Sequence, residues 1–251
     1  MVPKQPTWYI EAGSDKKLIA GCDQLGVPHV IFKSPPFSGG LPEERQEGSA
    51  ILYGATSVML AAKASPVWQD GVWYDPDSFK PSAYLKHYGD HFLSSDAKFL
   101  TIEQFAAEDH PDDYEFFIKP DDDLKQLCGQ PMDFEEFKRW YTGFAGIYDT
   151  MLNAATQIMV SGLKEIDNEY RFVVKEGKVI ASSAYRPKVS TDVPRIVRHA
   201  AEYWAELWSP ADVFVMDVAK CGEAVYVIEC NCFNASGLYA CDIPKILKSF
   251  L

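Results

Sequence analysis

The sequence predicts a protein of the α+β class, with a small α/β region at the start of the chain and a larger region of antiparallel strands and helices after it. Three observations support this prediction. Over the first 53 residues, strand-like and helix-like segments alternate, as they do in βαβ units. From residue 114 onwards, strand-like segments follow one another through short turns. The composition, with 47% hydrophobic and 24% charged residues in 251, is that of a folded globular chain.

The first region opens with a predicted βαβ unit. Its helix spans 15–24, with Ser14 as the expected N-cap, and the loop 34–48 contains three prolines and three glycines and shows no apolar period. The strands of this region are expected at 7–10, 29–32 and 50–53.

A polar run at 108–113 marks the expected domain boundary. It follows a helix-like segment at 101–107, is charged, contains a proline and lacks apolar periodicity. We therefore expect one region at 1–112 and a second at 113–251.

The second region shows the periods of both strands and helices. Glu176-Gly177 is a strong signal for a hairpin turn between two of its strands. The helix at 191–208 is expected to be capped by Asp192 and to bury one apolar side, made of Ile196, Ala200, Tyr203, Trp204 and Leu207. Strands are expected at 114–119, 157–160, 169–175, 178–185, 211–220 and 224–230, and further helices at 134–144 and from residue 243.

Charge and composition exclude several classes of function. The formal net charge of -12 argues against DNA or RNA as a partner, because phosphate binding needs clustered Lys and Arg. The apolar runs are far shorter than a membrane helix requires, and no secretory signal is visible, so we expect a cytoplasmic protein. The six cysteines form no CxxC pair, which disfavours a zinc site.

Two strand-like segments near the C-terminus carry the most informative polar side chains. Glu229 and Asn231 alternate with apolar residues and therefore share one face of a strand. If the preceding turn is centred on Glu223, Asp217 lies opposite Glu229 on that face. Two carboxylates and an amide beside an apolar layer suit Mg²⁺, which takes oxygen ligands together with nucleotide phosphates. The alternative is an ordinary polar face of an edge hairpin.

Two further groups of side chains suit a nucleotide. Lys119 ends an apolar strand, and Lys125 and Gly129 follow in the next loop, where an ammonium and a close backbone can hold phosphate. The alternative for Lys119 is an ordinary strand-end lysine. Glu169 and Arg171 share a strand face, and Arg186 follows across the hairpin. Arginines can hold transferring groups, although a surface ion pair between Glu169 and Arg171 is the alternative.

The order of these features resembles the ATP-grasp superfamily. The similarity is greatest to a phage and bacterial clade of small predicted ATP-grasp ligases that is named for two arginines and a lysine. It covers about 135 residues, from Tyr114 to the end of the chain. The features that carry it are Lys119-Pro120, the loop 125–129, Glu169-x-Arg171, the segment 183–186, Asp217 and the tract 228–239. The resemblance implies an ATP-grasp fold, in which a small pre-ATP-grasp region precedes two α+β subdomains that clasp the nucleotide.

The resemblance also implies roles for individual residues. Lys119 would contact the phosphates and the adenine side of ATP, the loop with Lys125 and Gly129 would cover the β and γ phosphates, and Arg171 would stabilise the transferring phosphoryl group. The remaining implied roles are adenine binding by the backbone of a hinge that includes Ser161 and Leu163, ribose contact by Glu169, magnesium binding by Asp217, Glu229 and Asn231, and substrate contact by Arg186.

The reaction that the resemblance implies is ATP-dependent ligation. A carboxylate takes the γ-phosphoryl group, giving an acylphosphate and ADP, and an amine then displaces phosphate, so the implied cofactors are ATP and magnesium. Small-molecule or peptide carboxylates and amines would be the partners, and the oligomeric state is open, a homodimer included. Two alternatives stand beside this one: an ATP-binding accessory or regulatory protein without turnover, and a kinase-like phosphotransferase.

Overall fold

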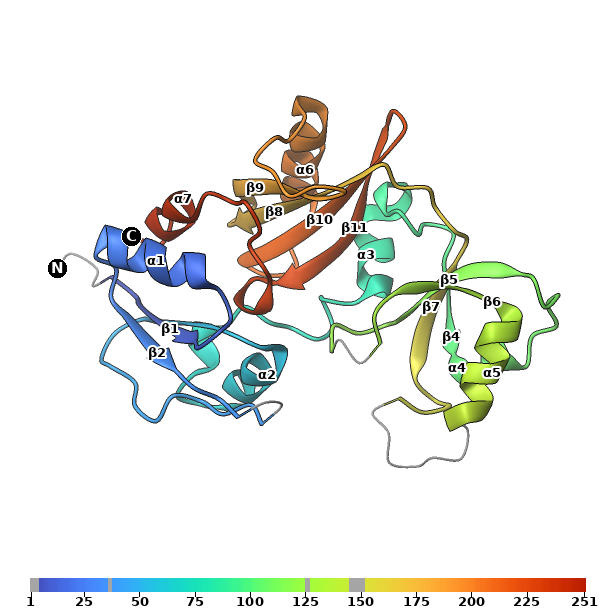
Figure 1. The fold of residues 1–251 in the computed structure, drawn as a ribbon, viewed down its shortest axis with the longest axis horizontal. Coiled ribbons are helices and arrows are strands. Elements are labelled where there is room, and N and C mark those ends of the chain that lie inside the picture. The colour runs from blue at the N-terminus through green and yellow to red at the C-terminus, as the bar shows by residue number, and fades with distance from the viewer. Residues whose placement is uncertain (1–4, 36–37, 125–126, 145–151) are drawn as a thin grey trace.

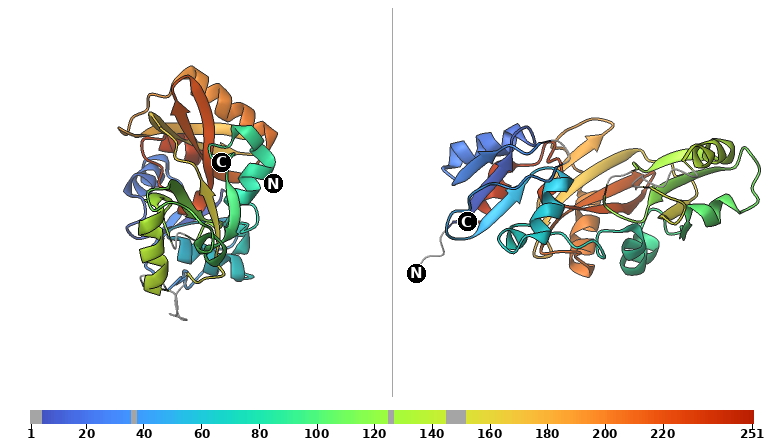
Figure 2. Two further views of the ribbon diagram at one scale, coloured as in Figure 1. Left: turned by 90° about the vertical axis from the view of Figure 1, so that its right-hand side faces the viewer. Right: turned by 90° about the horizontal axis from the view of Figure 1, so that it is seen from below.

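Three β-sheets lie in a row in the computed structural model, which describes residues 5–35, 38–124, 127–144 and 152–251. The parallel sheet lies near the N-terminus at one end of the row, an antiparallel sheet of four strands lies in the middle, and a smaller antiparallel sheet, also of four but mostly shorter strands, lies at the other end (Figure 1). Figure 2 shows from below that the molecule is elongated along this row. The predicted α+β class is confirmed.

The parallel sheet has the order β2-β1-β3, with β1 at Thr7–Glu11, β2 at His29–Phe32 and β3 at Ala50–Tyr53. This arrangement confirms the βαβ unit. Helix α1 spans Lys16–Leu25, and its cap is Asp15, whose carboxylate accepts from two helical N–H groups. Ser14 was the wrong choice, because its hydroxyl donates to the carbonyl oxygen of Glu11 instead.

Two helices, α2 at Thr56–Ala64 and α3 at Pro81–Tyr88, occupy segments for which the sequence analysis predicted no helix. Neither has a side-chain cap, and α3 begins with Pro81, which reads as a breaker in sequence but fits the first turn of a helix. Two short 3₁₀ helices, Gln69–Gly71 and Gly89–His91, lie in the same part of the chain.

The smaller antiparallel sheet has the order β4-β7-β5-β6. Phe116 and Ile118 of β5 are buried against helices α4 and α5 on one face, so Phe117 and Lys119 point to the other face. The elements are β4 at Lys98–Thr101, α4 at Ile102–Ala106, β5 at Glu115–Pro120, β6 at Gln130–Asp133, α5 at Phe134–Phe144 and β7 at Gln157–Ser161. The division of the chain at residue 112 stays a prediction.

The central sheet has the order β11-β10-β8-β9. The predicted hairpin turn between β8 and β9 is confirmed, since Glu176 and Gly177 both have positive φ angles of 51° and 71°. One face of the sheet packs on α3 and α6. The elements are β8 at Asn168–Lys175, β9 at Lys178–Arg186, α6 at Arg195–Leu207, β10 at Val213–Cys221, β11 at Ala224–Cys232, a 3₁₀ turn at Phe233–Ala235 and α7 at Ile243–Lys248.

Helix α6 buries a face that is rotated from the predicted one, with Trp204 common to both. Its buried residues are Val197, Ala201, Trp204 and Ala205, whereas Ile196, Tyr203 and Leu207 are 47–56% exposed. Beside Trp204 this face carries the small side chains Val197, Ala201 and Ala205, whose fit against the sheet is not registered by hydrophobicity alone. The helix begins at Arg195 after Pro194, without a side-chain cap, so the prediction of Asp192 as cap was wrong.

One hydrophobic cluster joins the parallel sheet to the central sheet. Trp8 and Ile10 of β1 belong to the same buried cluster as Val215 of β10 and Leu247 of α7. Helices α1 and α7 lie side by side (Figure 1), and a Cβ at Gly21 would come within 2.6 Å of Ile243. In the described part of the chain, no helix is long and apolar enough to cross a membrane.

Candidate active site

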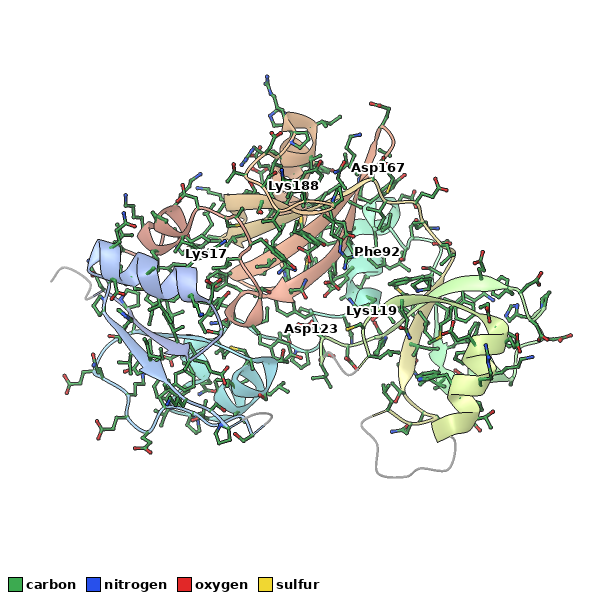
Figure 3. The ribbon with its side chains drawn as sticks, viewed as in Figure 1. Lys17, Phe92, Lys119, Asp123, Asp167 and Lys188 are labelled. Atoms are coloured by element: carbon green, nitrogen blue, oxygen red, sulfur yellow. The ribbon has the colours of Figure 1, made fainter. Side chains whose placement is uncertain are left out.

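A cleft of about 570 Å³ lies between the central sheet and the smaller antiparallel sheet. The central sheet presents Arg171, Asp217 and Glu229, while the smaller sheet presents Phe117 and Lys119. In Figure 3, Lys119 lies at the junction of the two sheets. Strand alternation places these side chains, because their neighbours along each strand fill the hydrophobic cores behind.

Asp217 and Glu229 are directly opposite each other in the antiparallel pair of β10 and β11. The turn is centred between Gly222 and Glu223, and a β-bulge next to Asp217 restores the predicted pairing. The bulge also leaves Ile228, the apolar residue before Glu229, without a partner on β10, and Ile228 lines the cleft.

Arg171 and Asp217 form a buried bidentate ion pair. The Nε and Nη2 groups of Arg171 donate to the two oxygens of Asp217 at 2.8 and 2.6 Å, and Nη1 donates to the carbonyl oxygen of Gly237 at 2.8 Å. The side chain of Asp217 is only 2% exposed. The alternative of a surface ion pair between Glu169 and Arg171 was therefore wrong.

The charge of this pair is held firmly. Burial lowers the pKa of the Arg171 guanidinium, but the adjacent Asp217 carboxylate outweighs burial, so the pKa lies above its usual range. The neighbouring Tyr185 also has a raised pKa, in this case because burial disfavours the phenolate and the charges of Asp217 and Glu169 add to the effect. The cleft therefore contains a permanent cation beside a neutral phenol.

Asn231 links the two carboxylates. Its Nδ2 group donates to Glu229 Oε1 at 3.0 Å and to Asp217 Oδ2 at 3.2 Å. The three predicted metal ligands thus lie together, although Asn231 does not line the cleft and is only 4% exposed.

Lys119 connects the two sheets through an ion pair with Glu229. Both side chains are about one-fifth exposed at the wall of the cleft, at 18% and 21% respectively. Both proposed metal-binding carboxylates therefore have a cationic partner. Glu229 pairs with Lys119 of the smaller sheet, and Asp217 pairs with Arg171 of its own sheet.

The apolar part of the cleft was not predicted residue by residue. Phe117, Met159 and Ile228 line it, and the alternation of β5 that exposes Lys119 would have identified Phe117. Gly129 also lines the cleft, and a Cβ at this position would lie 2.5 Å from the ring of Phe117. The absence of a side chain at Gly129 therefore leaves room for the aromatic ring.

Four further predicted residues line the same cleft. Ser161 and Leu163 lie where β7 leaves the smaller sheet, and the N–H of Gly162 between them donates to Asp96 Oδ2 at 3.0 Å. Glu169 Oε1 accepts from Arg186 at 3.1 Å, and both residues line the cleft. Lys125, predicted to contact phosphate, lies outside the described residues.

A comparison with protein families identifies the chain. Residues 61–250 match the model of an ATP-grasp domain, family 3 of the clade named for two arginines and a lysine. The chain belongs to this ATP-grasp family. The resemblance drawn from the sequence is confirmed, and the three-sheet architecture is that of an ATP-grasp fold. A comparison with curated proteins gave no match.

Solved ATP-grasp structures have the same fold at low sequence identity. A RimK domain ATP-grasp protein from Sphaerobacter thermophilus has a TM-score of 0.62 at 14% identity, covering 97% of this chain and 98% of its own. The ligase PsnB, in complex with its precursor peptide PsnA2 and AMPPNP, has a TM-score of 0.56 at 12% identity, with 100% and 97% covered. D-alanine–D-alanine ligase from Bacillus anthracis has a TM-score of 0.57 at 13% identity, with 98% and 91% covered.

The donor set of this ATP-grasp chain fits a magnesium ion bound together with a nucleotide. In the described part of the chain, no three His, Cys, Asp or Glu side chains are grouped to hold a metal unaided. Asp217, Glu229 and Asn231 offer two carboxylates and an amide, and Mg²⁺ usually takes one or two carboxylates with waters and phosphates. Each carboxylate oxygen has two lone pairs and can accept a cation beside its present partner. When bound, the ion would neutralise phosphate charge.

Proposed function

We propose that this ATP-grasp protein is an ATP-dependent carboxylate–amine ligase that works through an acylphosphate. The observation that carries the proposal is the convergence of two cations, Lys119 and Arg171, and two carboxylates, Asp217 and Glu229, on one cleft between two sheets. Phosphoryl transfer depends mainly on positioning and charge neutralisation, and this set of groups supplies both.

The nucleotide would lie along the cleft with its adenine at the apolar end. Phe117 and Met159 provide an apolar surface for the base, and the backbone beside Ser161 and Leu163 provides polar groups at its edge. Glu169 would reach the ribose. Lys119 and Gly129 would face the phosphates, with Lys125 as a further proposed phosphate contact.

The charged groups would act on the transferring phosphoryl group. Three of the five N–H donors of Arg171 are bonded to described residues, and two remain for a ligand. These donors would stabilise the negative charge of the transferring group as the substrate carboxylate attacks the γ-phosphorus and ADP leaves. The amine would then attack the acylphosphate carbon and release phosphate. Arg186, which is more exposed, would contact a substrate.

The reaction needs no covalent protein nucleophile, and the nearby thiols are poorly suited to be one. Cys230 is buried next to Tyr88, and burial raises its pKa well above the usual value. Cys232 is also buried and donates to Asn234. The raised pKa keeps the Cys230 thiol protonated, which disfavours nucleophilic attack.

A second cleft is the proposed location of a substrate. It has a volume of about 470 Å³ and is lined by residues from the ends of β1 and β3 and from the segment after β11, including Glu11, Gly54 and Gly237. Ligands of open α/β sheets bind at this edge. The carbonyl of Gly237 accepts from Arg171, so the second cleft borders the proposed reaction centre. PsnB forms a complex with a precursor peptide, and D-alanine–D-alanine ligase is named for an amino acid, so a peptide or amino acid is the substrate class proposed here.

Replacing Glu229 tests the proposed site. Glu229→Gln removes the charge that faces Lys119 and the proposed magnesium, so binding of AMPPNP in the presence of Mg²⁺ should weaken about tenfold or more. The measurement is isothermal titration calorimetry. Glu223→Gln, in the exposed turn of the same hairpin, is the matched control and should bind like the unaltered protein.

A turnover assay separates a ligase from its alternatives. We expect ADP and phosphate to form from Mg-ATP only when a carboxylate and an amine are both present, with the amide product detected by mass spectrometry. Binding of AMPPNP without turnover across a broad panel of amino acids and peptides would instead favour an accessory protein. Equal nucleotide affinity of Glu229→Gln and Glu223→Gln would show that the site is misplaced.

A further inference from the structure

Tyr239 has an unusual backbone conformation at the edge of the cleft. Its φ angle is 46°, and Glu176 in the hairpin turn is the only other non-glycine residue with a positive φ among those described. A bulky side chain in the left-handed region costs free energy, and such strain persists only where the surroundings impose it. Tyr239 is not in a hairpin turn, so something else must hold it.

Two hydrogen bonds fix the backbone around Tyr239. Its carbonyl oxygen accepts from Lys17 Nζ of helix α1 at 2.7 Å. The next N–H, of Ala240, donates to the hydroxyl of Ser183 at 3.1 Å. Ser183 is fully buried and lies opposite Arg171 in the pairing of β8 and β9. In Figure 3, Lys17 is on the side of α1 that faces the segment leading to α7.

The ring of Tyr239 packs on the arginine of the proposed reaction centre. The guanidinium carbon of Arg171 lies 4.8 Å from the centroid of the Tyr239 ring and 5.5 Å from that of Tyr185. The two tyrosine rings are stacked, with centroids 4.9 Å apart and planes 6° from parallel. An aromatic face attracts a guanidinium and also restricts the orientation of its plane.

We infer that Tyr239 is a positioning residue that holds the guanidinium plane of Arg171 in the orientation required for phosphoryl transfer. This inference rests on the proposed function. Asp217 and Gly237 together accept from all three guanidinium nitrogens, and the ring of Tyr239 against the guanidinium carbon limits tilting of the plane that carries the two remaining N–H donors. The strained backbone places the ring there, and Lys17 ties this placement to the N-terminal region.

Three substitutions of Tyr239 separate the ring from the backbone strain. Tyr239→Phe keeps the ring and should behave like the unaltered protein. Tyr239→Leu keeps a bulky residue at positive φ but removes the ring, whereas Tyr239→Gly removes both ring and strain. Tyr203→Leu, at an exposed tyrosine of α6, is the control for the loss of a tyrosine elsewhere.

The first readout is the NMR signal of the Arg171 Nε–H group, assigned by its disappearance in Arg171→Lys. The ring of Tyr239 should shift this signal by its ring current, so Tyr239→Leu and Tyr239→Gly should move it to a common new position, and Tyr239→Phe and Tyr203→Leu should not. An unchanged signal in Tyr239→Leu would overturn the inference. This readout needs no nucleotide and therefore stands even if the proposed function fails.

The second readout is the rate of ADP formation from Mg-ATP with the carboxylate and amine that support turnover in the unaltered protein. Misplacement of a group near the reacting atoms costs up to about a hundredfold, so Tyr239→Leu should lower kcat by about tenfold or more and change KM for ATP by less than about threefold. Equal kcat of Tyr239→Leu and Tyr239→Phe would overturn the inference. If no variant, nor the unaltered protein, binds Mg-ATP, the proposed function fails and the NMR signal alone decides the role of Tyr239.

Discussion

Cys22 in helix α1 shows how burial controls the ionisation of a single side chain. Burial raises the pKa of its thiol from 9.0 to about 11, and the negative charge of Asp23 adds to the effect. The folded protein therefore binds this proton more tightly than the unfolded chain does. The stability that follows is complete below about pH 9 and is lost as pH rises through about 11.

We predict that the free energy of unfolding falls between pH 9 and pH 11, and that Cys22→Ala reduces the slope. One group contributes at most about 1.4 kcal/mol per pH unit in this range. Urea unfolding at pH 8, 9.5 and 11 measures the slope. The decrease should not vanish in the variant, because the pKa values of Tyr84 and Cys230 are raised as well. Parallel curves for the two proteins would contradict the assignment to Cys22.

The individual side chains of the candidate site differ in how far the sequence could predict them. Glu229 and Asn231 were found because the side chains of a strand alternate between its two faces, and Lys119 was found by its position at the end of an apolar strand. Tyr239 could not be recognised as a contact of Arg171, because its position depends on a positive φ angle and on Lys17, which is 222 residues away in sequence. Long-range contacts of this kind leave no local pattern.

At the scale of elements, the pairing of Asp217 with Glu229 in the hairpin of β10 and β11 was predicted correctly, because two departures from the expected hairpin cancel each other. A turn centred on Glu223 was expected, but the turn lies half a residue earlier, between Gly222 and Glu223. The bulge beside Asp217 then shifts the pairing by one residue. Without the bulge, Asp217 would face Ile228, and Glu229 would point to the opposite side of the sheet. No sequence signal located that bulge.

Helix α6 offers a test of which face supports the fold. Lysine at Ile196 or Tyr203, both 56% exposed, should change the free energy of unfolding by less than about 0.5 kcal/mol. Trp204→Ala should lower it by about 3–5 kcal/mol, because Trp204 is 3% exposed and belongs to the core between α6 and the central sheet. Urea unfolding of the three variants makes the comparison. A large loss at Ile196 or Tyr203 would mean that this face is covered in solution.

At the scale of the whole molecule, Asn234 joins the parallel sheet to the ATP-grasp part. Its side chain is fully buried, accepts from Trp73 N–H at 2.9 Å, and donates to the carbonyl oxygens of Leu52 at 2.6 Å and Gly71 at 3.1 Å. The backbone carbonyl oxygen of Asn234 accepts from the N–H of Gly54 at 2.9 Å. The side-chain amide of Asn234 therefore provides hydrogen-bond partners for three backbone groups of the N-terminal region.

We predict that Asn234→Ala lowers the free energy of unfolding by about 3 kcal/mol or more, because it leaves several buried backbone groups without a partner. Asn153→Ala is the control, since Asn153 is exposed and its side chain accepts from the N–H of Ala155 in its own turn. Chemical unfolding of both variants, followed by circular dichroism, gives the two values. A loss at Asn234 no larger than that at Asn153 would contradict the joining role.

The three-sheet architecture was foreseen in part. The alternation of apolar residues identified most strands, and the family resemblance supplied their arrangement. Helices α2 and α3 and the strands β4 and β6 were missed, because they are short, lack side-chain caps or contain proline, and are stabilised mainly by the sheets on which they pack. Whether such segments become helices or strands is decided by tertiary packing and not by local propensity.

The cluster shared by the parallel and central sheets has a consequence for the limits of the folding unit. The segment that sequence comparison recognises starts at residue 61, within helix α2. A gene fragment cut there would encode Phe233 and Leu247 without Trp8 and Tyr53, against which they pack. A fragment that starts at residue 61 would therefore leave part of this buried cluster exposed to water, although it contains the whole segment by which its relatives are recognised.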